Sequence, residues 1–420
     1  MDMIQWREEI PVAGKYDVLV AGGGLAGAAA ALSAARRGQR VLLTEKQCAL
    51  GGLATTGLVN FWVPLCNGRG KMIIRGMAEE FLKLSIRDGF DTLPPAWKHG
   101  EPTAPTEDRC ATLFSAGLFS LALLKLLRDA GVTIAYDTVV TDVLMDGGAC
   151  RGVIAAGKNS KRFYETKMLV DATGDAELLK KAGVPTVDGR NYMTYYGEGV
   201  TLEGCKKALE TGNLAHAYYH PFGGPSTLYG DGQTPEMPLY HGADVDEINR
   251  YLQENQLLML EKELQKPRDA RAIHMLPGMP QLRTSRRIDG DVTFTETLVY
   301  QHRADSIGAI CDFDYRDRLY EVPYGTLVRS GFSNLITCGR SASASGWGWD
   351  VLRVIPPAVL TGQAAGIAAA MANETGAPIA QVPLAPLQKA LADTGVLIHF
   401  DDAWVPEEKK DAHGASEGHI

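Results

Sequence analysis

The sequence predicts an α/β fold, in which a mainly parallel sheet is covered by helices and a second, α+β region is inserted into the chain. Three observations lead to this prediction. A glycine-rich turn near the N-terminus joins an apolar strand to an alanine-rich helix. Two later apolar strands, at residues 168–171 and 334–338, also run into glycine-containing turns. Between them, residues 186–320 lack this alternation of strand and helix.

The composition predicts a globular protein that does not bind nucleic acid. The chain has 420 residues, of which 45% are hydrophobic and 22% charged, as in ordinary globular domains with a sizeable core. This length corresponds to two or three domains. The net charge is 42 − 50 = −8, and nucleic-acid binding needs clustered basic residues. We therefore expect a small-molecule substrate as partner, and oligomerisation stays open.

The cysteines and the N-terminus predict a cytoplasmic protein. The seven cysteines are scattered without a C-x-x-C pair, which argues against an iron–sulfur cluster or zinc ribbon and favours free thiols in a reducing compartment. Glu8 and Glu9 stand where a signal peptide needs bases. No uninterrupted apolar run reaches the roughly 18 residues of a membrane span.

The N-terminal unit has the pattern of a dinucleotide-binding βαβ motif. A strand at residues 17–21 precedes G-x-G-x-x-G at residues 22–27, a helix follows to residue 37, and a second strand covers residues 40–44. In this pattern Gly22 makes the tight turn, Gly24 lets the backbone approach a pyrophosphate, and Gly27 lets the helix pack on the strand. The unit is therefore Rossmann-like, and a nucleotide-binding function follows.

The residues after this unit favour FAD over NAD. Glu45 ends the second strand and is expected to accept hydrogen bonds from ribose hydroxyls, which disfavours a 2′-phosphate. The pair Gly51-Gly52 follows at once and lets the chain pass close to an extended cofactor. Thr55 and Thr56 offer hydroxyls to it. A simple NAD domain would instead continue into another helix–strand pair.

Further elements follow in order along the chain. Helices are expected at residues 77–85, 121–128, 244–266 and 358–372, and strands at 132–136, 139–144, 152–156, 163–166, 168–171, 292–299 and 334–338. The strand at 168–171 runs into Ala172-Thr173-Gly174-Asp175, a turn that brings backbone close to a ligand. Residues 341–350 are expected to form a loop, and Pro357 suits the first turn of the last long helix.

Together these motifs resemble the FAD-dependent oxidoreductases related to the fumarate reductase and succinate dehydrogenase flavoproteins, and more closely the bacterial family described simply as FAD-dependent oxidoreductase. The matching pieces lie at residues 20–27, 51–55, 170–175, 283–288, 322–327, 334–340 and 362–366. The resemblance implies a glutathione reductase-type FAD/NAD(P)-binding fold with two dinucleotide-binding-type units. It also implies these parts: a discontinuous FAD-binding domain of residues 1–59, 106–185 and 321–400, a loop and helix excursion at 60–105, a substrate domain at 186–320, and a mobile tail at 401–420.

The resemblance also implies how FAD is held. The first glycine turn would bind the pyrophosphate, Glu45 the adenosine ribose, the Val140 backbone the adenine, residues 52–55 the ribityl chain and flavin, and the last long helix would point its N-terminus at the flavin. The cofactor-binding residues are Gly22, Gly24, Leu25, Ala26, Gly27, Glu45, Lys46, Gly52, Leu53, Ala54, Thr55, Val140, Ala172, Thr173, Gly174, Asp175, Gly339 and Arg340. Covalent relatives carry a histidine near the second glycine pair, but no histidine precedes His99, so non-covalent FAD is expected.

The catalytic candidates are Arg283, Arg286 and His302. The two arginines are expected to clamp a substrate carboxylate or carbonyl beside the flavin, because guanidinium forks bind such groups with paired hydrogen bonds. Surface salt bridges are the alternative, above all for neighbouring Arg287. His302 is the candidate general base. His216 and His220 have a metal-ligand spacing, but Pro221 follows and no glutamate completes a zinc motif, so no metal is expected.

The predicted activity is hydride transfer between a small organic substrate and the flavin N5 atom. A fumarate-reductase-like ene-reductase is one alternative. A flavin-bearing electron-transfer subunit of a complex, or a binding protein without turnover, is another. Because cluster-binding cysteines are missing from the sequence, any electron acceptor or donor must be a separate molecule.

Overall fold

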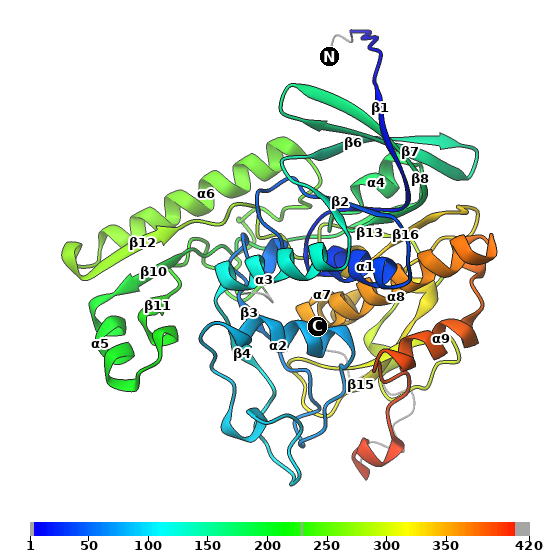
Figure 1. Ribbon diagram of the computed structural model, residues 1–420. Helices are drawn as coiled ribbons and strands as arrows, with labels where there is room; N and C mark the ends of the chain where they lie inside the picture. The colour runs from blue at the N-terminus through cyan, green and yellow to red at the C-terminus, as the bar shows by residue number, and fades with distance from the viewer. Residues whose placement is uncertain (1–3, 228–229, 408–420) are drawn as a thin grey trace.

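The computed structural model describes residues 4–227 and 230–407, and Figure 1 shows how its elements are arranged. Residues 408–420 of the predicted mobile tail lie outside this part. The strands are β1 Val12–Ala21, β2 Val41–Thr44, β3 Phe61–Trp62, β4 Thr112–Leu113, β5 Thr133–Ala135, β6 Val139–Asp146, β7 Ala149–Gly157, β8 Ser160–Asp171, β9 Thr186–Asp188, β10 Glu198–Thr201, β11 Tyr218–Tyr219, β12 Arg271–Met275, β13 Arg286–Ile288, β14 Ser306–Cys311, β15 Leu319–Pro323 and β16 Leu335–Thr337. The helices are α1 Leu25–Arg36, α2 Met77–Arg87, α3 Ala116–Asp129, α4 Glu177–Lys181, α5 Leu202–Thr211, α6 Val245–Leu264, α7 Gly346–Arg353, α8 Ile355–Thr375 and α9 Leu384–Asp393.

The largest sheet confirms a mixed α/β fold with a parallel centre. Its strand order is β5-β2-β1-β8-β7-β6, and β16 also pairs with β8. The pairs β5–β2, β2–β1, β1–β8 and β8–β16 are parallel. The carboxyl ends of these strands therefore meet at one edge of the sheet, which is where open α/β sheets bind ligands.

One long strand, β8, replaces two shorter ones that the sequence predicted. Residues 163–166 and 168–171 were expected as separate strands, but β8 is continuous from Ser160 to Asp171. Its first half completes an antiparallel meander with β6 and β7, and its second half pairs with β16. The pairing of β8 with β1 continues from Phe163 to Asp171, so the ladder leaves no room for a turn between the two halves.

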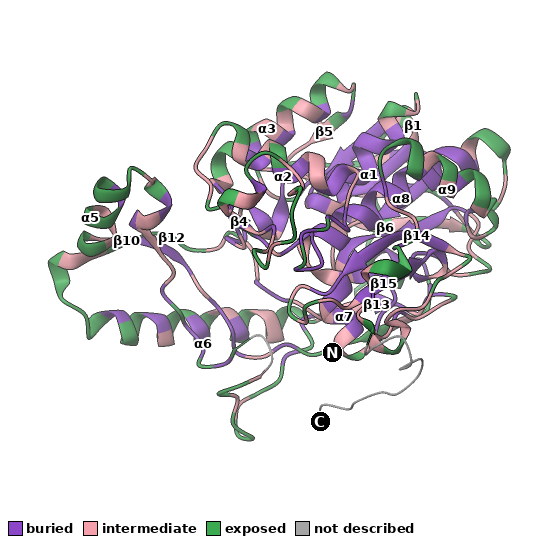
Figure 2. Ribbon diagram, turned by 90° about the horizontal axis from the view of Figure 1, so that it is seen from below, coloured by how far each residue is buried: buried purple, intermediate pink, exposed green. Residues whose placement is uncertain are grey.

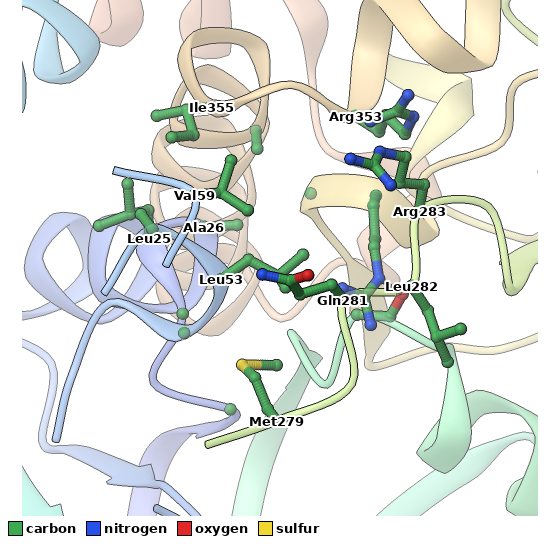
Figure 3. A pocket seen from close by; sticks show the side chains of 18 of the residues that line it. Leu25, Ala26, Leu53, Val59, Met279, Gln281, Leu282, Arg283, Arg353 and Ile355 are labelled. Atoms are coloured by element: carbon green, nitrogen blue, oxygen red, sulfur yellow. Dashed lines mark hydrogen bonds between the residues drawn. The ribbon is translucent and has the colours of Figure 1, made fainter. Parts of the chain in front are cut away.

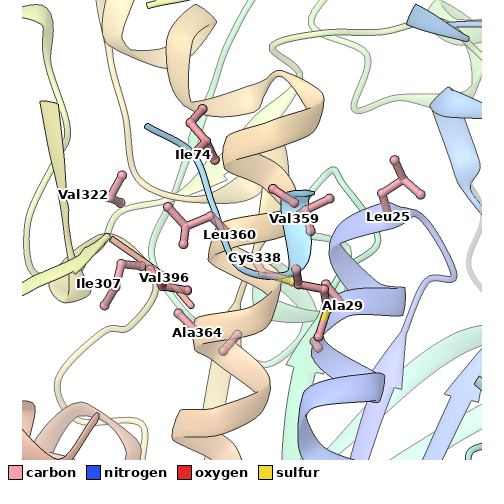
Figure 4. Close-up of a cluster of buried hydrophobic side chains, with 14 of the residues drawn as sticks. Leu25, Ala29, Ile74, Ile307, Val322, Cys338, Val359, Leu360, Ala364 and Val396 are labelled. Atoms are coloured by element: carbon pink, nitrogen blue, oxygen red, sulfur yellow. The ribbon is translucent and has the colours of Figure 1, made fainter. Parts of the chain in front are cut away.

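Helices α8 and α1 pack against each other at the centre of the core (Figure 4). Two glycines of α8 lie at their contact. A Cβ atom at Gly362 would lie 2.1 Å from the Ala26 carbonyl oxygen, and one at Gly366 would lie 2.2 Å from that of Ala30. Only glycine permits this approach of two helix backbones. Helix α8 is long and apolar enough to span a membrane, but 94% of its most apolar window is buried inside the fold. Its composition is that of a core helix.

The segment at residues 341–350, predicted as a loop, contains most of a helix. Helix α7 covers Gly346–Arg353. Its tryptophans anchor it, since the Trp349 indole N–H donates to the Arg340 carbonyl at 2.8 Å and the Trp347 indole N–H donates to Asp312 at 2.7 Å. The many small residues in this segment conceal the helix, because the stabilising contacts are long-range.

The middle of the chain forms an arm beside the sheet domain. Strands β10, β11 and β12 make an antiparallel sheet, with α5 and α6 beside them. The predicted helix at 244–266 is confirmed as α6. The predicted strand at 292–299 is wrong, because residues 296–298 form a 3-10 turn and only Phe294 makes an isolated bridge, to Ala344. Strand β14, within the predicted substrate domain, packs on α8 and α9.

Candidate active site

A cavity of about 740 Å³ opens at the carboxyl edge of the parallel sheet. Its size lies within the range of ligand pockets. The ends of β1 and β2, the turn after β8 and the N-terminal ends of α1 and α8 line one half of it. Residues of the arm line the other half, and Figure 3 shows their side chains projecting from the facing wall.

The first glycine turn presents bare backbone to this cavity. Gly22 has φ +105°, and a Cβ there would lie 2.3 Å from the Ala172 carbonyl oxygen. At Gly24, by contrast, a Cβ would have no described atom within 4 Å. Helix α1 begins directly after Gly24, and in the described structure no side chain caps it and no acidic residue occupies its first turn. Its free N–H groups and positive dipole end therefore suit an anion.

Glu45 holds the glycine turn in place. Its carboxylate accepts hydrogen bonds from the backbone N–H groups of Gly23 and Gln47, both at 2.7 Å. Burial raises the pKa of Glu45, and these two hydrogen bonds work against that rise. Since each carboxylate oxygen has a second lone pair, Glu45 can also accept a hydroxyl from a ligand in the cavity.

The turns after β8 and β16 meet at the same cavity, although 165 residues separate them in the chain. The guanidinium of Arg340 donates to the Gly174 carbonyl at 2.8 Å and to the Asp175 carboxylate at 2.8 Å. This ion pair is mostly buried. Arg340 therefore locks the two turns together while its side chain borders the cavity.

Most residues predicted to hold the cofactor line the cavity: Gly22, Gly24, Leu25, Ala26, Glu45, Lys46, Gly52, Leu53, Ala54, Val140, Ala172, Thr173, Gly174, Gly339 and Arg340. Three others lie behind this lining. A Cβ at Gly27 would sit 1.9 Å from the Gly22 carbonyl oxygen, Asp175 is paired with Arg340, and the Thr55 hydroxyl donates to the Leu50 carbonyl at 2.6 Å. Thr56, predicted to face the cofactor with its hydroxyl, donates to the Gly52 carbonyl instead.

These residues fit an extended dinucleotide such as FAD. The open space at Gly24 gives a phosphate direct access to backbone. At Gly52 the backbone passes close to the glycine turn, since a Cβ there would lie 3.0 Å from the Gly24 Cα, so two stretches of bare backbone lie side by side at the cavity. Helices α1 and α8 both direct their N-terminal ends into the same cavity. Two separate helix dipoles thus favour negative charge at two places along one ligand.

The other half of the cavity is lined by side chains from distant segments. These residues are Val59, Phe61, Val63, Thr194, Tyr196, Phe222, Gly224, Pro225, Ser226, Thr227, Lys262, Met279, Gln281, Leu282, Arg283, Phe313 and Arg353. Among these residues, only Arg283 was predicted from the sequence as a site residue. The tyrosine cluster around Tyr196 was a visible signal, as was Arg353 two positions before α8, whereas Lys262 carried no signal in its helical context.

Two buried amides position Arg283. The Gln281 side chain donates to the carbonyls of Gly57 and Tyr196, at 2.8 and 3.0 Å. The Asn191 carbonyl oxygen accepts from the backbone N–H groups of Arg283 and Thr284, at 2.6 and 3.1 Å. The backbone that carries Arg283 is therefore fixed on both sides.

Arg283 lies beside Arg353 at the cavity wall (Figure 3). Desolvation, together with the positive charge of Arg353, lowers the pKa of Arg283 to about 10. Arg353 is balanced by Asp350, which accepts from its Nε and Nη2 atoms. Burial raises the pKa of Tyr196 to about 12. Both arginines and the neutral phenol of Tyr196 are thus donors at neutral pH.

The structure does not bring the other catalytic candidates to this cavity. Arg286 pairs with Asp188 at 2.7 Å across the β13–β9 ladder, outside the cavity. Arg287 is buried, donates to the Ile288 carbonyl and the Ser343 hydroxyl, and lies over the Trp349 ring. The side chains of Arg283 and Arg286 diverge because β13 turns the latter towards β9.

His302 lies in a separate cluster with His399. Its Nδ1 is 2.6 Å from the buried Glu321 carboxylate, and its Nε2 is 2.9 Å from Asp402. The His399 ring also contacts Glu321, at 2.9 Å. None of these four residues lines the cavity, so the geometric basis for a general-base role of His302 is missing.

The two histidines considered as metal ligands do not share a helix face. His216 belongs to a 3-10 turn that ends at Ala217, and His220 follows β11. His220 instead packs edge-on against Tyr196 and lies 3.1 Å from the Gly197 carbonyl oxygen. The change from helix to strand between them removes the helical spacing on which the metal alternative depended.

The chain belongs to the FAD dependent oxidoreductase family, whose sequence model matches residues 17–222 and 240–391. FAD is therefore its cofactor and the protein is an enzyme of this class, as the motifs predicted. A digeranylgeranylglycerophospholipid reductase of Methanoculleus marisnigri is 29% identical over 181 residues, which cover 41% of this chain and 42% of that protein. The protein of the same name from Methanospirillum hungatei is 26% identical over 260 residues, which cover 57% of this chain and 61% of the relative. The chain thus spans about half the length of these relatives.

Two solved structures match the chain at lower sequence identity. A geranylgeranyl bacteriochlorophyll reductase-like protein from Thermoplasma acidophilum is 15% identical, and the match covers 93% of this chain and 94% of that one with a TM-score of 0.43. The p-nitrophenol 4-monooxygenase PnpA from Pseudomonas putida is 16% identical, and the match covers 93% of this chain and 91% of that one with a TM-score of 0.43.

Proposed function

We propose that this FAD-dependent oxidoreductase transfers a hydride between a small organic substrate and its flavin. The observation that carries the proposal is the continuity of one cavity from the glycine turn at Gly24 to the arm residues Tyr196 and Arg283. A ligand seated in the arm half would share the cavity with the cofactor, without a wall between them. When bound, FAD supplies the two-electron chemistry, which amino-acid side chains lack.

The residues of this chain supply binding, orientation and exclusion of water. The backbone at Gly24 and the N-terminal end of α1 would hold the pyrophosphate, and Glu45 the ribose. Arg283 and Arg353 can orient a substrate through their guanidinium groups. Tyr196 keeps its proton at neutral pH because burial raises its pKa, so its hydroxyl can donate to a substrate oxygen. Phe61, Val63 and Leu282 make the wall apolar.

Reduction of a carbon–carbon double bond is the second candidate. The relatives are named as digeranylgeranylglycerophospholipid reductases, and the apolar lining suits an apolar chain. This candidate differs from the first only in that the hydride passes from the flavin to the substrate and the acceptor is a carbon–carbon double bond. A flavin-bearing electron-transfer role stays the alternative in which the arm half holds no substrate.

Anaerobic reduction of the FAD-loaded protein tests the proposal. Alcohols, sugars, amines, saturated acids and NAD(P)H are mixed with the oxidised protein, and unsaturated acids and prenyl lipids with the dithionite-reduced protein, while the visible flavin absorbance is followed. We expect one compound class to reduce or reoxidise the flavin with saturating concentration dependence. If only a one-electron carrier protein exchanges electrons with the flavin, the electron-transfer alternative replaces hydride transfer.

A further inference from the structure

Arg283 lines the cavity, and its guanidinium has no ion pair of its own in the described part of the chain. Within residues 4–227 and 230–407, its guanidinium forms no hydrogen bond or ion pair, and its backbone N–H donates to the Asn191 side chain. The side chain is half-buried, and Figure 3 shows it next to Arg353. A desolvated guanidinium beside a second one is costly unless an anion compensates it.

The other cations around the cavity are accounted for. Arg340 is paired with Asp175, and Arg353 with Asp350. Lys262 donates to the carbonyls of Gly223 and Gly224, at 2.5 and 3.4 Å. Lys46 is exposed to solvent. Asp350 pairs with Arg353 and also acts electrostatically on Arg283. Because one carboxylate balances one charge, the two arginines together keep one positive charge, in the half of the cavity that faces away from the glycine turn.

The two arginines lie side by side at the cavity wall and leave donors available there. Asp350 occupies Nε and Nη2 of Arg353, so Nη1 stays available. All five N–H donors of Arg283 are available. Gln281 and Asn191 hold the backbone that carries Arg283 at the cavity wall. Two neighbouring guanidinium groups at a cavity wall, with donors left over, are the arrangement expected of a site that binds an anion.

We propose that Arg283 and Arg353 bind an oxyanion, a carboxylate or a phosphate, at the end of an otherwise apolar substrate. The apolar body would lie along Tyr196 and Phe222, whose rings are 5.8 Å apart, and along Leu282. This inference deepens the proposed function and rests on it in one respect, that the bound anion is the molecule undergoing reaction.

Binding of dead-end ligands to the FAD-loaded protein tests the subsite without turnover. Benzoate, phenyl phosphate and the neutral benzamide are titrated, with the flavin difference spectrum and calorimetry as readouts. We expect at least one of the two anions to bind and benzamide to bind at least tenfold more weakly. The relative affinity of benzoate and phenyl phosphate identifies the oxyanion as carboxylate or phosphate.

Variants assign the binding to the arginines. Arg283→Gln should retain FAD and weaken anion binding at least tenfold, Arg283→Lys should weaken it less because charge persists without the fork, and Arg353→Gln should also weaken it. Arg286→Gln is the matched control, since Arg286 pairs with Asp188 outside the cavity, and should leave anion binding unchanged. If Arg283→Gln does not fold, Arg283→Lys alone still decides.

Three results would overturn the proposal. The first is that neither anion binds the native protein. The second is that either Arg283 variant binds the anion as the native protein does. The third is loss of FAD in Arg283→Lys or Arg283→Gln with the fold intact, which would assign the guanidinium to the cofactor. Anion binding without any substrate-driven flavin reduction would leave this subsite standing while removing the proposed function, so the two can fail separately.

Discussion

The two halves of the cavity are built by different means. Bare backbone at Gly22, Gly24 and Gly52 forms much of the cofactor half, and Gly22 and Gly24 lie in the turn that directly follows β1. The arm half consists of side chains such as Tyr196 and Arg283, whose segments are joined only by tertiary contacts. Main-chain groups therefore form much of the surface offered to the cofactor, whereas the arm half offers its ligand mostly side chains.

The burial of the two regions differs in the same way (Figure 2). Helix α8 in the sheet domain is buried along nearly its whole length. Helix α6 in the arm has only four buried residues, and its Leu257, Leu260 and Leu264 are 60%, 53% and 70% exposed. Substitutions should therefore act on the fold in the sheet domain, and on ligand binding or local stability in the arm.

The largest effect is expected from Gly27→Val. A Cβ at Gly27 would lie 1.9 Å from the Gly22 carbonyl oxygen, so α1 must move away from β1. We expect a loss of about 3 kcal/mol or more, seen as loss of soluble protein or a much lower melting temperature. Gly117→Val is the matched control, because no described atom lies within 4 Å of a Cβ there. Equal stability of the two variants would contradict the close-packing role of Gly27.

Gly24→Val should separate cofactor binding from folding. The position has φ −62°, which any residue adopts, and a Cβ there enters open cavity space. We expect a folded protein whose far-ultraviolet circular dichroism matches that of the apoprotein, but with FAD affinity reduced more than about 100-fold, or about 2.7 kcal/mol. FAD content after gel filtration measures this. A stable variant saturated with FAD would contradict the cradle at Gly24.

Lys262→Met should weaken the arm half alone. The Lys262 ammonium ties α6 to the carbonyls of Gly223 and Gly224, of which Gly224 borders the cavity. Removing a charged donor should cost about 1.5 kcal/mol, with unchanged FAD content, as measured by chemical denaturation. Lys206→Met serves as control, because its pair with Glu210 is exposed and contributes at most about 0.5 kcal/mol. Loss of FAD in Lys262→Met would break the distinction between the halves.

The smallest effect is a pH dependence at His302. The contact with Glu321 raises the pKa of His302 above its ordinary value of 6.5. The folded state therefore binds the proton more tightly, and this stabilisation is complete below pH 6.5 and disappears as the pH rises through the folded-state pKa. His302→Phe keeps the stacking on Phe400 but removes the titration.

The His302→Phe comparison is made by thermal melts at pH 5.5 and pH 8. We expect the native protein to gain relative to the variant at the lower pH, by no more than about 0.5 kcal/mol because the ring is 43% exposed. Turnover per bound FAD should be unchanged. If the difference in stability between native protein and variant is the same at pH 5.5 and pH 8, the raised pKa of His302 is contradicted. If turnover is slower in the variant, His302 acts in the active site after all.

Much of the cofactor half was predictable from the sequence. The unit from β1 through α1 to Glu45 depends on residues close together in the chain, and steric limits leave only glycine at Gly22 and Gly27. The turns at Ala172–Asp175 and at Gly339 were predictable for the same reason, since each follows an apolar strand directly. Local spacing and backbone sterics thus determined the cofactor, the sheet and the place where they meet.

Only the tertiary structure decided the arm half. Arg283 and Arg286 are three positions apart, yet pairing of β13 with β9 directs Arg286 to Asp188 while Arg283 stays at the cavity. Arg353 reaches the same cavity from α7, a helix that exists because Trp349 is buried against Arg340. His302, with its suggestive chemistry, is held by Glu321 and Asp402 elsewhere. Which side chains face a ligand depends on strand register and long-range packing, and neither leaves a local pattern in the sequence.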